Sequence, residues 1–399
     1  MNLRTAVMIG VLAVAVVATG EQLYQLHDDT SLLRPIDYME YWSAGRATLT
    51  GQNPYDGDVL YSLQRQMGND SGSALMMWNP PWTLPLTMTI GTVPWRIGQL
   101  LWFALNLVAV LASVAVLWRL YFNDWRLAGV AIAVACVFAP TAFLLLLGQI
   151  SGLMLLGLAG FLWFTNTSRF ALAGLLAALT AIKPHLLVPF AVVLILQSVR
   201  GHAVWKSVLA GGGLLVVCGL LPLAWNPDVW SQYREATGAG HAPSHTTLHD
   251  WEHPTLGYEI RRAMPNKPFA AMFIPLVVVV PLVVVYWWRR RVKWDWLIEL
   301  PRLVLVSLLA APYGAWVFDL VLLLVPVIQA TAWLVADGRR GLWLVAAALF
   351  VALNALALAS VSQPHSTANL WIVPLTIGGY LLAGWLTRAT PAITHAVRP

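Results

Sequence analysis

Two carboxylates, Asp37 and Glu40, lie three residues apart in the segment PIDYMEYWSAGRATLTGQNPYD, residues 35–56, which follows an apolar run. On a helix this spacing places both side chains and Tyr41 on one face. A carboxylate that is partly desolvated at a membrane surface gains basicity and can act as a general base. The alternative is an acidic first turn of a surface helix, stabilised by the helix dipole. Spacing alone favours this second interpretation.

A lysine, Lys183, stands at the end of an apolar segment in TAIKPHLLVPF. Such a lysine can simply extend its ammonium group along an apolar surface to water. A charge at the rim of a membrane-spanning segment is also a typical functional group, and this ammonium would suit a phosphate, with His185 close enough to assist. Asp319, at the start of a later apolar run, is either a carboxylate on a helix dipole or a polar group that reaches the same cavity.

A histidine series with a spacing of four lies in a later polar segment: His241, His245, His249 and His253. This spacing places metal ligands on one helical face, as in many zinc sites. Pro243 and Pro254 interrupt the segment, however, and it contains no cysteine. The series is therefore interpreted mainly as a solvated loop, and we expect no bound metal or other cofactor; whether the reaction requires a divalent ion stays open.

The elements that position these residues follow from composition. Of the 399 residues, 59% are hydrophobic and 11% are charged, against about 25% in a soluble domain. The 21 Trp and 11 Tyr are suited to the membrane interface. The Lys and Arg residues behind the net charge of +6 are dispersed, which argues against nucleic-acid binding. Cys136 and Cys218 lie in apolar runs, so no disulfide framework is expected. The sequence predicts a polytopic, all-α membrane protein.

About twelve spanning helices are predicted, since each needs about 20 mostly apolar residues. They cover residues 3–24, 98–120, 127–147, 150–164, 170–182, 186–199, 204–223, 269–288, 297–311, 318–335, 342–361 and 370–386. The segment 82–93, which begins at the last residue of WNPPW (residues 78–82), is expected to be re-entrant or to lie on the surface. The whole chain, 1–399, is interpreted as one membrane-embedded domain.

The short loops with several Lys and Arg residues define the cytoplasmic side. If the spans alternate, the longer polar segments 25–99 and 225–268 lie outside the membrane, the first with juxtamembrane helices and the second with the histidines. Both termini are then cytoplasmic, in a plasma membrane. The first apolar run is interpreted as an uncleaved helix, although a signal peptide is the alternative.

Five segments together resemble glycosyltransferase family 87, within the membrane-embedded GT-C superfamily. They are PIDYMEYWSAGRATLTGQNPYD, WNPPWTLPL, LLLLGQISGLMLL, ALTAIKPHLLVPF and APYGAWVFDLVLLLVP, in the order found in the family. The resemblance implies a GT-C bundle with a non-crossing segment after the first outer loop. It also implies an inverting transfer of a hexose, commonly mannose, from a polyprenyl-phosphate sugar to a lipid-linked or cell-envelope glycan acceptor at the outer face.

The resemblance also implies roles for individual residues. Asp37 matches the catalytic Asp, which takes the proton of the acceptor hydroxyl, and Lys183 matches the lysine expected at the donor phosphate. The expected substrate-binding residues are Glu40, Tyr41, Gln149, Lys183, His185 and Asp319. The late motif departs from the family, because an extra residue separates Pro312 from Trp316 and the polar or His residue expected between Trp316 and Asp319 is absent. Asp319 is therefore only a provisional candidate for the acid or phosphate-binding role of this motif.

The main alternative is a transporter or flippase of a lipid-linked sugar. It predicts ionisable residues near helix midpoints, broken helices in matching halves and an inverted repeat, and none of these is evident in the sequence. A receptor or structural membrane protein would explain the composition but not Asp37 and Lys183.

Overall fold

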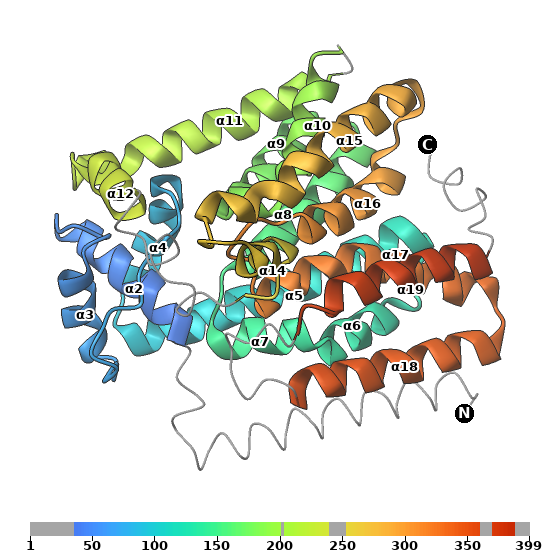
Figure 1. The fold of residues 1–399 in the computed structure, drawn as a ribbon, viewed down its shortest axis with the longest axis horizontal. Coiled ribbons are helices and arrows are strands. Elements are labelled where there is room, and N and C mark those ends of the chain that lie inside the picture. The colour runs from blue at the N-terminus through green and yellow to red at the C-terminus, as the bar shows by residue number, and fades with distance from the viewer. Residues whose placement is uncertain (1–35, 201–202, 239–252, 360–368, 388–399) are drawn as a thin grey trace.

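The structure is a computed structural model that describes residues 36–200, 203–238, 253–359 and 369–387. Within these ranges it is helical and has no strand. Figure 1 shows a bundle of long helices with a group of short helices, α2, α3 and α4, at one end. The expected first span, residues 3–24, lies outside the described residues.

The N-terminal half of the described chain contains α2 (Ile36–Leu49), α3 (Gly57–Arg65), η1 (Pro81–Thr83), α4 (Leu84–Gly91), α5 (Trp95–Phe122), α6 (Ala128–Val137), α7 (Ala139–Leu147), α8 (Ser151–Asn166), α9 (Phe170–Ala177), η2 (Ala178–Ile182), η3 (Pro184–Leu186) and α10 (Val188–Ser198). The rest contains α11 (Trp205–Leu220), η4 (Leu221–Ala224), α12 (Val229–Thr237), α14 (Leu256–Ala263), η5 (Phe269–Phe273), α15 (Ile274–Arg290), η6 (Arg291–Lys293), α16 (Trp296–Leu309), η7 (Val317–Leu323), α17 (Leu324–Asp337), α18 (Arg340–Ala359) and α19 (Ile372–Leu386). The η elements are 3-10 helices.

Five described helices, or helix pairs in continuous register, are long and apolar enough to cross a membrane: Trp95–Phe122, Trp205–Ala224, Phe269–Lys293, Val317–Asp337 and Arg340–Ala359. A sixth crossing is possible if α6 and α7, bent by 66°, form one broken span. Shorter apolar helices occupy most of the other predicted spans. The chain is thus an all-helical membrane protein, while the count of twelve spans stays a prediction.

The bend between α6 and α7 occurs at Phe138, two residues before Pro140, which cannot donate a backbone hydrogen bond. The break frees the backbone N–H of Ala139, which donates to Asn354 Oδ1 of α18 at 2.8 Å. Phe138 also stacks on Phe350 of α18, with ring centroids 5.9 Å apart. A polar side chain from a distant span therefore satisfies the broken backbone, as a membrane interior requires.

No helix in the segment 82–93 is long enough to cross a membrane. It contains η1 and α4, and α4 has eight residues, a length of about 12 Å that is too short for a bilayer. Helix α4 packs closely against α2, because a Cβ atom added to Gly45 would lie 2.0 Å from the carbonyl oxygen of Thr87. In Figure 1 α4 stands beside α2 and below α12. The two short helices form one unit at the end of the bundle.

Candidate active site

Helix α2 carries Asp37, Glu40 and Tyr41, which their spacing in the sequence places on one helix face. Asp37 lies in its first turn and Tyr41 is fully buried, while Asp37 and Glu40 are partly exposed. Two hydrogen bonds on other sides of α2 fix its rotation: Tyr38 donates to the carbonyl of Trp95 at 2.9 Å, and Trp42 Nε1 donates to the carbonyl of Val93 at 2.9 Å. The Asp37 face is therefore held toward the bundle.

The turn between α7 and α8 contributes Gln149. Gly148 has a φ of +71°, which ends α7 and turns the chain, and its carbonyl accepts a hydrogen bond from Trp102 Nε1 at 2.7 Å. The buried Gln149 side chain then accepts at Oε1 from two groups, Tyr41 Oη at 2.8 Å and Lys183 Nζ at 3.2 Å. The amide thus joins the acidic helix to the lysine.

Lys183 and Asp319 form a buried ion pair with a distance of 2.8 Å from Nζ to Oδ1. The same Oδ1 accepts a hydrogen bond from Ser151 Oγ, and Oδ2 accepts from the backbone N–H of Trp316 at 3.0 Å. Both oxygens of Asp319 are therefore occupied. Lys183 Nζ also lies 4.8 Å from the centre of the Phe318 ring.

Residues of the WNPPW segment hold the backbone just before Lys183. Asn79 Nδ2 donates to the carbonyl of Ile182 at 3.0 Å, and Trp82 Nε1 donates to the carbonyl of Ala181 at 2.8 Å. These bonds occupy carbonyls at the end of η2, where helical partners are missing. The conspicuous WNPPW segment therefore positions the lysine, a role that its sequence alone does not indicate.

The acidic face of α2 has perturbed proton affinities. Burial is the largest cause of the shift in the pKa of Asp37, which is raised to about 6. The hydrogen bond from Gln149 and the positive charge of Lys183 lower this pKa, whereas the negative charge of Asp319 raises it further. Burial also raises the pKa of Glu40 to about 8, and the neighbouring charge of Asp37 increases that shift. At neutral pH, Asp37 is thus mainly ionised and Glu40 mainly protonated.

His185 lies next to the network on the loop that contains Tyr313 and Gly314. Its ring stacks on Tyr313 with centroids 4.5 Å apart, and Nε2 lies against Gly314. Burial, followed by the charge of Lys183, lowers the pKa of His185 to about 3. The imidazole is therefore neutral, which suits a hydrogen bond to a substrate better than an ion pair.

The structure brings Asp37, Tyr41, Gln149, Lys183 and Asp319 into one connected cluster, with Glu40 and His185 at its edges. The elements that carry these residues contact one another: η7 packs against α7 and α8, and α2 contacts α7. Sequence reasoning missed Ser151, although a serine at the first position of α8 is a typical helix-start residue.

Three of the four regularly spaced histidines lie outside the described residues: His241, His245 and His249. The fourth, His253, is buried between the rings of Tyr258 and Trp316, at centroid distances of 5.2 Å and 5.5 Å. His253 therefore packs beside the cluster, next to Trp316, whose backbone binds Asp319. The sequence did not indicate this position.

The family model of glycosyltransferase family 87 matches residues 78–312, more than half of the 399-residue chain. The chain therefore belongs to glycosyltransferase family 87, as the five motifs indicated. No curated protein and no solved structure matches it. The matched residues include Gln149 and Lys183 but end before Asp319 and begin after Asp37.

Proposed function

We propose that this glycosyltransferase transfers a hexose, with mannose as the first candidate, from a polyprenyl-phosphate sugar to a lipid-linked or cell-envelope glycan at the outer face of the plasma membrane. Family membership supports sugar transfer, and the apolar helices support a lipid-borne donor. The observation that carries the proposal is the buried cluster that links Asp37 to Lys183 through Gln149.

Asp37 is the proposed general base. Its carboxylate accepts the proton of the acceptor hydroxyl while that oxygen bonds to the anomeric carbon. The bond between that carbon and the phosphate oxygen breaks, and polyprenyl phosphate leaves with the electron pair, so the anomeric configuration inverts. A base with a pKa of about 6 is ionised at neutral pH yet still accepts a proton well. Such a base typically contributes about 10²–10⁴-fold to the rate.

Lys183 is the proposed contact of the donor phosphate. Its ammonium group carries three protons, and two of them are used by Gln149 and Asp319. The third is available to a phosphate oxygen as charge develops on the leaving group. Asp319 holds the ammonium in place, and neutral His185 supplies a further hydrogen bond. Glu40, protonated at neutral pH, is proposed to donate to a sugar hydroxyl.

The test uses purified full-length protein in detergent, radiolabelled polyprenyl-phosphate mannose and a crude lipid-glycan fraction as acceptor. We expect label in a new glycosidic product with the wild type, and a loss of at least about 10²-fold with Asp37→Asn. Thr48→Val, which removes only the hydrogen bond from Thr48 Oγ1 to the carbonyl of Ala44 within α2, is the control on the same helix. Full transfer by a folded Asp37→Asn protein would refute the base assignment. If the donor only moved from one side of the membrane to the other and no new glycosidic bond formed, the protein would instead be a flippase.

A further inference from the structure

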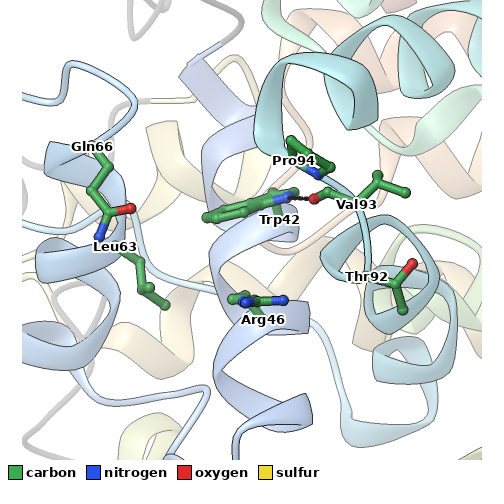
Figure 2. Close-up of a pocket in the computed structure, with 7 residues that line it drawn as sticks. All are labelled: Trp42, Arg46, Leu63, Gln66, Thr92, Val93 and Pro94. Carbon is green, nitrogen blue, oxygen red and sulfur yellow. Dashed lines mark hydrogen bonds between the residues drawn. The ribbon is translucent and has the colours of Figure 1, made fainter.

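A pocket of about 360 Å³ lies on the other side of α2, between the end of α3 and the turn from α4 to α5 (Figure 2). Its lining combines apolar and polar side chains from three elements: Trp42, Arg46, Leu63, Gln66, Thr92, Val93 and Pro94. In Figure 2, Trp42 and Arg46 lie on successive turns of α2, with Leu63 and Gln66 on one side and Thr92, Val93 and Pro94 on the other.

The pocket is separate from the candidate active site. At about 3.6 residues per turn, Arg46 points to the side of α2 opposite Asp37. Trp42 lines the pocket on the same side as Arg46, and its hydrogen bond to the carbonyl of Val93 fixes its ring there. A ligand in this pocket therefore does not occupy the space where sugar transfer is proposed.

The polar groups of the pocket suit an anion. The exposed Arg46 makes one long hydrogen bond, from Nη1 to the carbonyl of Gly91 at 3.4 Å, so most of its donors remain available. Two further exposed arginines are close in sequence to lining residues: Arg65 precedes Gln66, and Arg96 follows Pro94 by two positions. Across the described part of the chain, none of these three arginines forms an ion pair. Guanidinium groups match phosphate oxygens in geometry as well as charge.

An apolar strip begins beside the pocket. Helix α5 starts directly after Pro94, and its first turns expose Ile97, Leu100 and Leu101 by 52%, 71% and 53%. Because α5 is long and apolar enough to span the membrane, these side chains face lipid. The basic pocket therefore lies where a headgroup would sit if its acyl chains followed the start of α5.

We propose that this pocket binds the headgroup of a resident anionic phospholipid, with the phosphate on Arg46 and the acyl chains along α5. The two components of the site, an unpaired arginine in a pocket and a lipid-exposed apolar strip, match the two parts of such a lipid. Bound there, the lipid bridges α2 and α3 to the spanning helix α5. The proposal depends on the membrane location of the protein and not on the proposed sugar transfer.

The test measures lipid binding to the purified, delipidated full-length protein by native mass spectrometry and by thermal stabilisation. The probes are phosphatidylglycerol, phosphatidylcholine and inorganic phosphate. We expect phosphatidylglycerol to bind and stabilise most, and Arg46→Gln to weaken its binding by about tenfold, the loss of one charge-assisted contact. Arg126→Gln, the same change of charge at the other end of α5 on a side chain that is 89% exposed, is the matched control.

A second variant, Thr92→Trp, fills the pocket from an exposed lining position and leaves all charges in place. It is expected to reduce phosphatidylglycerol binding as Arg46→Gln does. Equal binding by Arg46→Gln and Arg126→Gln would overturn the proposal, as would unchanged binding by Thr92→Trp. Saturation by inorganic phosphate alone would show a free-anion site and would overturn the lipid assignment.

Discussion

Lys183 and Asp319 are 136 positions apart in the chain, yet their side chains form a buried ion pair 2.8 Å long. This contact joins the segment after η2 to the 3-10 helix η7. The Ser151 hydroxyl and the backbone N–H of Trp316 also donate hydrogen bonds to the Asp319 carboxylate. The cluster is therefore assembled from elements that are distant in sequence, and its parts depend on one another.

Removal of one charge from this pair should be costly. Asp319→Asn leaves the Lys183 ammonium buried without its counter-charge, and we expect a loss of about 3–5 kcal/mol in the free energy of unfolding. The double variant Lys183→Met/Asp319→Asn removes both charges and should lose less than the single variant. Glu259→Gln, in the more exposed Glu259–Arg262 pair, serves as the control and should change stability by less than about 1 kcal/mol. Unfolding in detergent checks this, and an equal loss in Asp319→Asn and Glu259→Gln would contradict it.

The hydroxyl of Tyr41 should matter for rate more than for folding. Tyr41→Phe removes the hydrogen bond to Gln149 and so loosens the amide that connects Asp37 with Lys183. We expect transfer to fall by about tenfold, the equivalent of one hydrogen bond. Thr48→Val removes a hydrogen bond of the same length, from Thr48 Oγ1 to the carbonyl of Ala44, on the same helix and outside the cluster, and should keep its rate. Equal rates for the two variants would remove Tyr41 from the mechanism.

The pH dependence of transfer should report Asp37. Because the base acts when ionised, kcat/KM should rise with pH and level off above an apparent pKa of about 6. The Asp37→Asn variant should lack this limb in whatever activity remains. A limb near pH 4, the ordinary range of an aspartate, would show that burial does not raise the pKa of this carboxyl.

Stability should depend on pH through Glu40. Its pKa rises from 4.5 to about 8 in the folded protein, so between these values the folded state binds a proton that the unfolded state releases. Stability is then highest at the acidic end of this window and falls as pH rises toward about 8. Glu40→Gln should flatten the dependence of Tm between about pH 6 and 8, above the range in which Asp37 contributes. An unchanged slope would contradict the assignment.

The close contact of α2 with α4 should not tolerate a side chain. Gly45→Ala places a methyl group 2.0 Å from the carbonyl oxygen of Thr87, so one helix must move. We expect a loss of about 1–3 kcal/mol in stability and lower transfer, because α2 carries Asp37. Gly212→Ala, in α11 with open space around the added atom, should be neutral or slightly stabilising. Thermal unfolding and transfer assays compare the two, and a fully active Gly45→Ala variant would contradict the expectation.

The sequence predicted helices well where apolar runs are long, as in α5 and α11, since burial in lipid needs no detailed packing information. It did not predict the break at Phe138, although Pro140 marks it, because the apolar run continues across the bend. It also treated Asp319 as either a helix-start carboxylate or a site residue. The structure shows that one oxygen caps η7 at Trp316 while the other meets Lys183, so the two interpretations were not exclusive.

Contacts between distant segments account for most of what the sequence could not supply. Motif order suggested that Asp37, Gln149 and Lys183 belong together, but no local pattern links Ser151 to Asp319 or Trp82 to Ala181. Those pairs depend on how the helices pack. The pocket at Arg46 was missed for the same reason, since its walls come from three elements that meet only in the folded chain.

The separation of the cluster along the chain also has a consequence for biosynthesis. The lysine at 183 leaves the ribosome long before its carboxylate at 319, so during translation the growing chain carries an ammonium group at the end of an apolar helix with no counter-ion from η7. The spans up to α16 are therefore synthesised before the Lys183–Asp319 ion pair can form. The cluster can be completed only after η7 has followed them, so its assembly depends on a late segment of the chain.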